Sequence, residues 1–126
     1  MGHDKHHISV EVKTAFLDDR SDPSRNQYVF AYTVTLTNRG DAPAQLISRH
    51  WIITDAENKI QEVKGLGVVG QQPLIKPGES FEYTSGATLA TGMGTMRGAY
   101  NMVDEDGSAF EVPIPPFTLS VPRVLH

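Results

Sequence analysis

The stretch Leu46–Gly70, LISRHWIITDAENKIQEVKGLGVVG, decides the fold. Its apolar run holds the only tryptophan of the chain, Trp51, and is typical of a central β-strand. The polar pair Arg49-His50 interrupts this run, and the dense glycine motif Gly65–Gly70 ends the stretch. The other apolar segments have the pattern of ordinary strands, so we expect them to cover this one.

Strict alternation through Ala44–Thr54 leads to a conflict. If Trp51 faces the core, alternation turns Arg49 inward as well, whereas if His50 faces the core, Trp51 is exposed. An arginine is rarely buried without a partner. We therefore expect a β-bulge near Ser48–His50 that re-aims one side chain.

Alternating apolar and polar residues predict further strands on both sides of this stretch. The clearest is Tyr28–Leu36, which has aromatic and aliphatic residues on one face and threonines on the other. The turn residues Asn38–Asp41 predict a β-hairpin from this strand into Ala44–Thr54. A short strand is predicted at Lys59–Lys64, with Ile60 facing the core.

A second hairpin is predicted near the C-terminal end of the chain. Its tip is the acidic turn Asp104–Gly107, and its return strand contains Phe110, Val112 and Ile114. The pair Pro115-Pro116 is expected to end that strand, because proline cannot donate to a β-ladder.

Seven to eight short strands without helical periodicity predict an all-β fold. The expected architecture is an antiparallel immunoglobulin-like or fibronectin type III-like β-sandwich, in which Tyr100 is a candidate for the corner tyrosine. With 126 residues and no internal repeat, the chain is interpreted as one domain over residues 1–126, with a flexible N-terminus at 1–7.

The composition excludes several functional classes. A formal net charge of −4 argues against a nucleic-acid binder, which needs clustered lysine and arginine. No window reaches the roughly 18 consecutive apolar residues of a membrane span. Without cysteine there is no disulfide framework, thiolate zinc site or cysteine nucleophile. The N-terminal residues lack the apolar core of a signal peptide, so a cytoplasmic location is expected.

The letters Gly65-x-Gly67-x-x-Gly70 match the dinucleotide-binding fingerprint, but their context does not. That fingerprint needs a helix whose first amides hold the pyrophosphate, and Pro73 excludes such a helix here. Two alternatives stay open. The glycine amides, with Lys64 beside them, form a small anion-binding nest, or the glycines only shape a bend between strands.

Residue types give little support for metal binding or catalysis. His50 lies in a predicted strand, where a structural role and a binding role are both open. We expect no cofactor, and no stoichiometric metal site formed by residues 8–125, because zinc and cobalt sites need several converging ligands. No Ser-His-Asp arrangement and no apolar carboxylate pair is recognisable, so the protein is predicted not to be an enzyme. The remaining histidines lie near the two ends of the chain: His3, His6, His7 and His126.

Several of these segments together resemble the ApaG family. The resemblance covers most of residues 8–126, in the family's order. The matching segments include FAYTVTLTN (Phe30–Asn38), SRHWIITDA (Ser48–Ala56), GLGVVGQQP (Gly65–Pro73) and PGESFEYTSG (Pro77–Gly86), and their combination is more specific than any one of them. It implies a fibronectin type III-like sandwich found in cytoplasmic bacterial proteins and at the ends of larger eukaryotic proteins, where the domain looks like a protein-binding module.

The resemblance also implies an association with cobalt resistance and magnesium efflux, which has to be indirect for a chain without a membrane span. The function predicted is a non-enzymatic cytoplasmic protein-binding module, a monomer or weak homo-oligomer, whose partner binds near Arg49 and His50. The alternative is a protein that binds pyrophosphate or a nucleotide phosphate. The family's glycine motif, which has been connected with such binding, maps to Gly65, Gly67 and Gly70.

Overall fold

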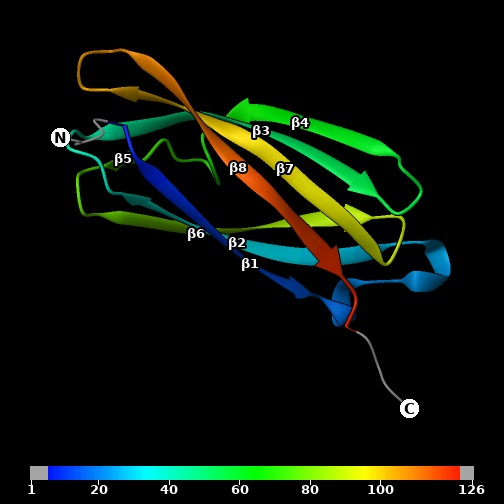
Figure 1. The fold of residues 1–126 in the computed structure, drawn as a ribbon. Coiled ribbons are helices and arrows are strands. Elements are labelled where there is room, and N and C mark those ends of the chain that lie inside the picture. Colours follow the sequence, from blue (N-terminus) through cyan, green and yellow to red (C-terminus); the bar gives the residue numbers. More distant parts are fainter. Residues whose placement is uncertain (1–5, 123–126) are drawn as a thin grey trace.

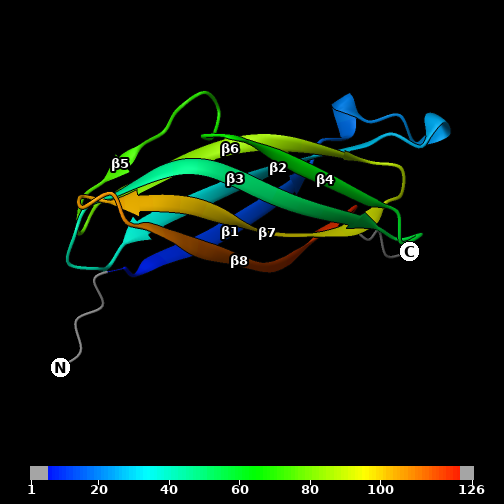
Figure 2. The same ribbon diagram turned by 90° about the horizontal axis from the view of Figure 1, so that it is seen from above.

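The computed structural model describes residues 6–122, which form two antiparallel β-sheets packed face to face (Figures 1 and 2). One sheet has the strand order β1-β2-β6, and the other has the order β4-β3-β7-β8, with β5 paired to β3. The predicted antiparallel sandwich of seven to eight strands is therefore confirmed. The strands are β1 (Ile8–Phe16), β2 (Tyr28–Asn38), β3 (Ala44–Asp55), β4 (Ile60–Leu66), β5 (Leu74–Ile75), β6 (Ser80–Leu89), β7 (Met93–Asp104) and β8 (Ala109–Ser120).

Helical structure in the described residues is limited to two short 3₁₀ turns, η1 (Asp18–Arg20) and η2 (Pro23–Arg25). Both lie in the polar loop between β1 and β2. Nothing helical in residues 6–122 is long and apolar enough to cross a membrane.

The predicted hairpin between β2 and β3 is wrong, because the two strands lie in opposite sheets. The connection is fixed by Asn38, whose side chain is buried (1% exposed) at the end of β2. Its Nδ2 donates to the carbonyls of Ala42 (2.9 Å) and Ile75 (2.8 Å), and its Oδ1 accepts from the Gly40 amide (2.9 Å). A buried amide that satisfies three backbone groups holds the chain as it crosses between sheets.

The structure contains a β-bulge in β3, but the bulge lies at Ile47, just before the expected position near Ser48–His50. Along the β3–β7 ladder Leu46 pairs with Met102 and Ser48 with Asn101, so Ile47 is the extra residue. Because the bulge changes the phase of alternation, Leu46 (0% exposed) and Trp51 (1% exposed) both face the core. Arg49, in phase with Trp51, is therefore directed toward the inner face of the sheet.

The expectation that Ile60 faces the core is also wrong. In the β3–β4 ladder Trp51 pairs with Val63 and Thr54 with Ile60, so Ile60 lies on the outer face and is 67% exposed. β4 is an edge strand, and a sheet edge buries little of either face.

The proline pair does not end the last strand. β8 continues through Pro115 and Pro116 because the β7–β8 ladder shifts register there, with Met96 opposite Phe117 and Gly98 opposite Ile114. An edge strand tolerates proline at a bulge, where no ladder hydrogen bond is required. The acidic tip of this hairpin is as predicted, and the Asp104 carboxylate accepts the amides of Asp106 (2.9 Å) and Ser108 (3.1 Å).

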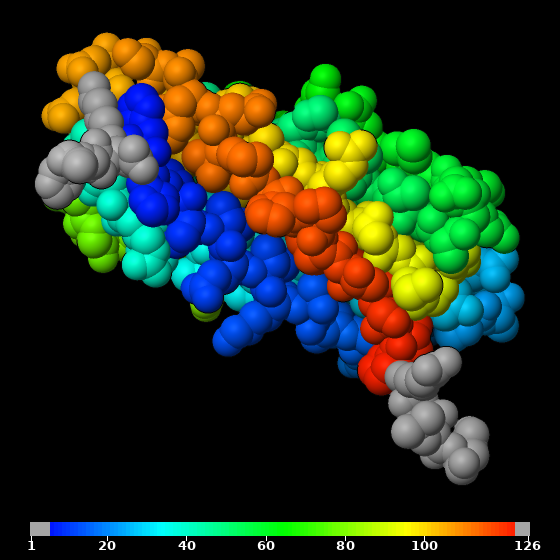
Figure 3. Space-filling model, viewed as in Figure 1, coloured from blue at the N-terminus to red at the C-terminus, as the bar shows by residue number. Residues whose placement is uncertain are grey.

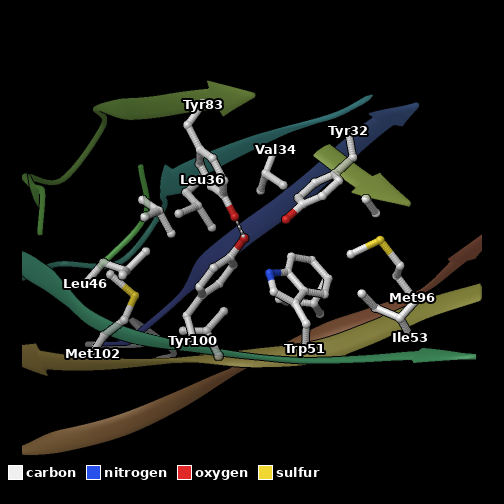
Figure 4. Close-up of a cluster of buried hydrophobic side chains, with 14 of the residues drawn as sticks. Tyr32, Val34, Leu36, Leu46, Trp51, Ile53, Tyr83, Met96, Tyr100 and Met102 are labelled. Carbon is white, nitrogen blue, oxygen red and sulfur yellow. Dashed lines mark hydrogen bonds between the residues drawn. The ribbon is translucent and has the colours of Figure 1, made fainter. Parts of the chain in front are cut away.

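The core is centred on Trp51, whose indole packs edge-on against Tyr32, Tyr100 and Phe117 at centroid distances of 5.3, 6.2 and 5.8 Å. Figure 4 shows Tyr83 and Tyr100 reaching toward each other from opposite sheets, where their hydroxyls form a hydrogen bond. The Tyr100 hydroxyl is therefore bonded to another side chain. A corner tyrosine would instead be bonded to backbone. The Trp51 Nε1–H has no hydrogen-bond partner among the described residues.

The buried tyrosine pair predicts a loss of stability at alkaline pH. Burial raises the pKa of both Tyr83 and Tyr100 above the ordinary value of 10.0. The folded protein therefore keeps these protons longer than the unfolded chain does, so their contribution is complete below about pH 10 and decreases as the pH rises further. Each buried hydroxyl is expected to add about 1.4 kcal/mol per pH unit to this decrease.

Urea unfolding between pH 7 and pH 11.5 measures this effect. The Tyr83→Phe/Tyr100→Phe double variant should show a shallower decrease above about pH 10 than the wild type, because neither ring can then ionise. Single variants leave one hydroxyl unpaired and should cost about 1–3 kcal/mol at neutral pH. An unchanged pH dependence in the double variant would contradict this interpretation.

Candidate functional site

A hollow on the sheet around β3 and β4 brings the predicted partner-binding residues beside part of the predicted anion site. It has a volume of about 450 Å³. Its lining includes Arg49 and His50 from β3, and Lys64 and Gly65 from β4. Ser48, Leu66 and Asn101 complete it, with the Asn101 Nδ2 donating to the Ser48 Oγ at 3.0 Å.

Arg49 crosses the neighbouring strand at Gly65. The two residues are paired in the β3–β4 ladder, and a Cβ at position 65 would lie 2.8 Å from the Arg49 Nη1. The absent side chain thus makes the space that the guanidinium occupies. From there the Nη1 donates to the carbonyls of Leu66 (3.0 Å) and Gly67 (2.9 Å), so Arg49 fixes the first residues of the glycine bend.

The bend itself is a tight two-residue turn. Val68 and Gln71 exchange two backbone hydrogen bonds of 2.8 and 2.9 Å, and the central residues Val69 and Gly70 have φ values of 43° and 80°. Positive φ at both central positions is the type I′ pattern, which favours Asn-Gly. A β-branched residue with positive φ is a genuine outlier, so Val69 holds local strain. Gly67, with a φ of 64°, has no room for a side chain, because a Cβ would lie 2.3 Å from the Gln71 carbonyl oxygen.

The charged residues beside the bend form a short row on the outer face. His50 pairs with Lys64 across the ladder, and the His50 Nε2 donates to the Glu62 Oε2 at 2.6 Å. This hydrogen bond, and secondarily the Lys64 ammonium, lowers the pKa of Glu62. The row therefore carries both signs of charge instead of a single positive patch.

Two apolar side chains at the bend are largely exposed. Leu66 is 75% exposed and Val69 is 54% exposed. Sequence reasoning did not find them, because the glycine motif specifies nothing at the positions between its glycines. The sequence feature that indicates their exposure is the presence of apolar residues among turn-forming glycines, where no neighbouring strand covers them.

The residues of the predicted anion site are divided between two hollows. Lys64 and Gly65 line the hollow already described, whereas Gly67 and Gly70 line a smaller one of about 250 Å³ with Gln71 and Gln72. The Gly67 amide already donates to the Ile47 carbonyl at 2.8 Å, and the Val68 amide donates within the turn. In residues 6–122, the loop amides of Val69 and Gly70 have no such acceptor.

The histidines near the chain ends do not gather at one point within the described residues. His6 lies against the β7–β8 hairpin, where its Nε2 is 2.8 Å from the Asp104 Oδ2 and its ring stacks on Phe110 at 3.9 Å. His3 and His126 lie outside the described residues. Within residues 6–122, no three histidine, aspartate or glutamate side chains converge as a metal site requires. The predicted absence of a metal site stays a prediction.

Comparison with known proteins supports the sequence resemblance. The ApaG domain family model matches residues 18–104. Protein ApaG of Thiobacillus denitrificans is 63% identical over 122 residues, which cover 97% of this chain and 96% of the relative. Protein ApaG of Ralstonia nicotianae is 60% identical over 122 residues, covering 97% and 98% of the two chains.

A solved structure agrees with the fold as well. The crystal structure of an ApaA protein from Bordetella pertussis is 58% identical and superposes with a TM-score of 0.94, covering 98% of this chain and 100% of that one. The family model thus covers the central part of the chain, and the relatives and the crystal structure cover nearly all of it. The chain therefore belongs to the ApaG family.

Proposed function

We propose that the protein is a non-enzymatic protein-binding module that uses the bend at Gly65–Gly70, the residues Leu66 and Val69, and the flanking pair Arg49 and His50 to contact another protein. The observation that carries this proposal is the exposure of Leu66 (75%) and Val69 (54%) on a bend that Arg49 holds by two hydrogen bonds. Exposed apolar side chains with a polar rim are the usual composition of a protein interface.

A rigid bend suits this role for an energetic reason. Ordering a loop on binding costs free energy, and a loop that is already fixed avoids most of that cost. Val69 has a φ of 43°, and relieving this backbone strain would raise the free energy of unfolding by about 1–2 kcal/mol. An exposed valine contributes little to folding stability at such a position, so a role in recognition accounts for its presence.

The same proposal places the protein in the cytoplasm, in agreement with the absence of cysteine from the sequence. Any connection with cobalt resistance or magnesium efflux would then be indirect. It would pass through the bound protein, and not through transport by this chain.

Replacing Val69 with asparagine separates binding from stability. Asn-Gly is the preferred type I′ pair, so Val69→Asn should raise the free energy of unfolding by about 1 kcal/mol. The same change removes an apolar contact and should reduce capture of the partner from lysate severalfold. Thermal unfolding and quantitative pull-down on immobilised protein measure the two effects.

Met93→Asn is the matched control, because Met93 is similarly exposed (52%) but begins β7, at the opposite end of β3 from the bend. It should leave every captured protein at the wild-type amount. Equal recovery of all partners by Val69→Asn and wild type would refute the bend as the contact surface.

The second candidate function is binding of a small anion such as pyrophosphate or a nucleotide phosphate. The amides of Val69 and Gly70, which have no acceptor in the described part of the chain, favour it. The charges do not, because Lys64 lines the other hollow and the Arg49 Nη1 is already bonded to two carbonyls. The arrangement therefore supports protein binding better than anion binding.

Calorimetric titration with pyrophosphate and with ATP, each with and without Mg²⁺, tests the second candidate. We expect no saturable heat and no shift in melting temperature at millimolar ligand, since a site with two free amides lacks a paired cation. Saturable binding of either ligand would instead establish the anion function.

A further inference from the structure

The five-stranded sheet has an open edge at β4. Among residues 6–122, β4 is hydrogen-bonded to β3 and to no other strand. At the opposite edge of this sheet, β1 lies against β8 and covers it (Figure 3). At the near edge, β4 forms the outer margin of the sheet (Figure 1). Three apolar residues of β4 are exposed on this edge: Ile60 (67%), Val63 (37%) and Leu66 (75%).

The direction of the free backbone groups follows from the ladder. The Gly67 amide donates to the Ile47 carbonyl (2.8 Å), and the Asp55 amide donates to the Lys59 carbonyl (3.0 Å). Antiparallel pairs alternate between hydrogen-bonded and non-hydrogen-bonded, so Gln61, Val63 and Gly65 use their backbone groups toward β3. The amides and carbonyls of the even-numbered residues, from Ile60 to Leu66, therefore point away from the sheet.

The sequence of β4, IQEVKGL, is complementary to itself when run antiparallel. With Val63 opposite Val63 of a second copy, Glu62 lies opposite Lys64 and Ile60 lies opposite Leu66. All four of these residues are even-numbered, so each outward amide and carbonyl meets a partner across the new ladder. Their side chains share one face, where cross-strand pairs of opposite charge or of apolar character are stabilising.

Neighbouring registers lose this complementarity. A shift that centres the pairing on Glu62 sets two glutamates opposite each other, and one that centres it on Lys64 does the same with two lysines. Like charges directly opposite are destabilising. A shift of one residue places outward groups opposite residues whose own groups already bond β3. The charge pattern thus selects a single register with a two-fold axis at Val63.

We propose that this edge binds a second copy of the chain, with the two β4 strands paired antiparallel about Val63 into one continuous sheet. The contact is isologous, since each residue meets the equivalent set in its partner, and it closes after two copies. It covers the edge that would otherwise invite uncontrolled strand addition. The inference does not rest on the proposed function: Leu66 belongs to both surfaces, but Val69 lies outside the paired range and the β4 contact is chiefly through backbone.

Charge reversal gives the first test, read by sedimentation equilibrium from about 10 µM to about 1 mM protein. The wild type should pass from its 13.8 kDa monomer toward twice that mass. Glu62→Lys and Lys64→Glu should each raise the dimer dissociation constant about tenfold or more, since each change places like charges opposite at two symmetric positions. The Glu62→Lys/Lys64→Glu double variant should recover the wild-type value.

The matched control is Glu111→Lys, an equal change of charge at an exposed residue of β8, which should leave the mass distribution unchanged. A wild type that stays monomeric to about 1 mM would overturn the proposal. So would single variants that dimerise as the wild type does, or a double variant that stays as weak as the single ones. If β4 instead paired with a strand from another protein and did not self-associate, the purified chain would stay monomeric and the proposal would be overturned.

Cysteine cross-linking tests the register itself, and the chain has no cysteine of its own to interfere. Residues directly opposite in a non-hydrogen-bonded antiparallel pair have Cβ atoms about 4.5–5.5 Å apart, within easy reach of a disulfide after a small adjustment. Val63→Cys should therefore form a covalent dimer under mild oxidation. Ile60→Cys, which is more exposed than Val63 (67% against 37%) but lies far from its own symmetry mate, should not. Equal cross-linking of both variants, or of neither, would contradict the proposed register.

Discussion

The extra residue Ile47 in β3 is the constraint on which the rest of the structure depends. Without this bulge, alternation could not bury both Leu46 and Trp51. Arg49 is in phase with Trp51 and also points inward, where the guanidinium needs space and acceptors. Gly65 supplies the space, and the carbonyls of Leu66 and Gly67 are the acceptors. The buried face of β3 is therefore linked through Arg49 to the edge strand and the bend.

Alternation in the sequence predicted the strands and the sandwich, because the burial of one face leaves a direct periodic signal. It also located the conflict at Arg49, which Gly65 and the carbonyls of Leu66 and Gly67 resolve. It could not predict which sheet the chain enters after Asn38, since a turn sequence does not record a buried amide bonded to Ile75. Ile60 was misplaced because an edge strand exposes apolar residues that would be buried in a central strand. Pro115 and Pro116 were predicted to end the last strand because the sequence does not show the register shift that accommodates them.

The candidate site was predicted in part. Arg49, His50, Lys64 and Gly65 were expected to matter, and the structure places them around one hollow. The exposure of Leu66 and Val69 could not be predicted, because Leu66 lies on an edge strand and Val69 lies in a type I′ turn with an unfavourable φ of 43°. The pair of Arg49 and Gly65 was also hidden, since it joins residues of neighbouring strands whose register the sequence does not specify. The exposure of Leu66 and Val69 and the pairing of Arg49 with Gly65 both depend on contacts in the folded chain that residue types alone do not reveal.

The central claim is that Gly65 is required because Arg49 lies across it. A double-mutant cycle of Gly65→Ala and Arg49→Ala, read by chemical denaturation, tests it most directly. In the wild-type background Gly65→Ala should cost about 1–3 kcal/mol, because its Cβ meets the guanidinium. In the Arg49→Ala background the same change should cost close to nothing, since Gly65 has no positive φ to strain. An equal cost in both backgrounds would contradict the account.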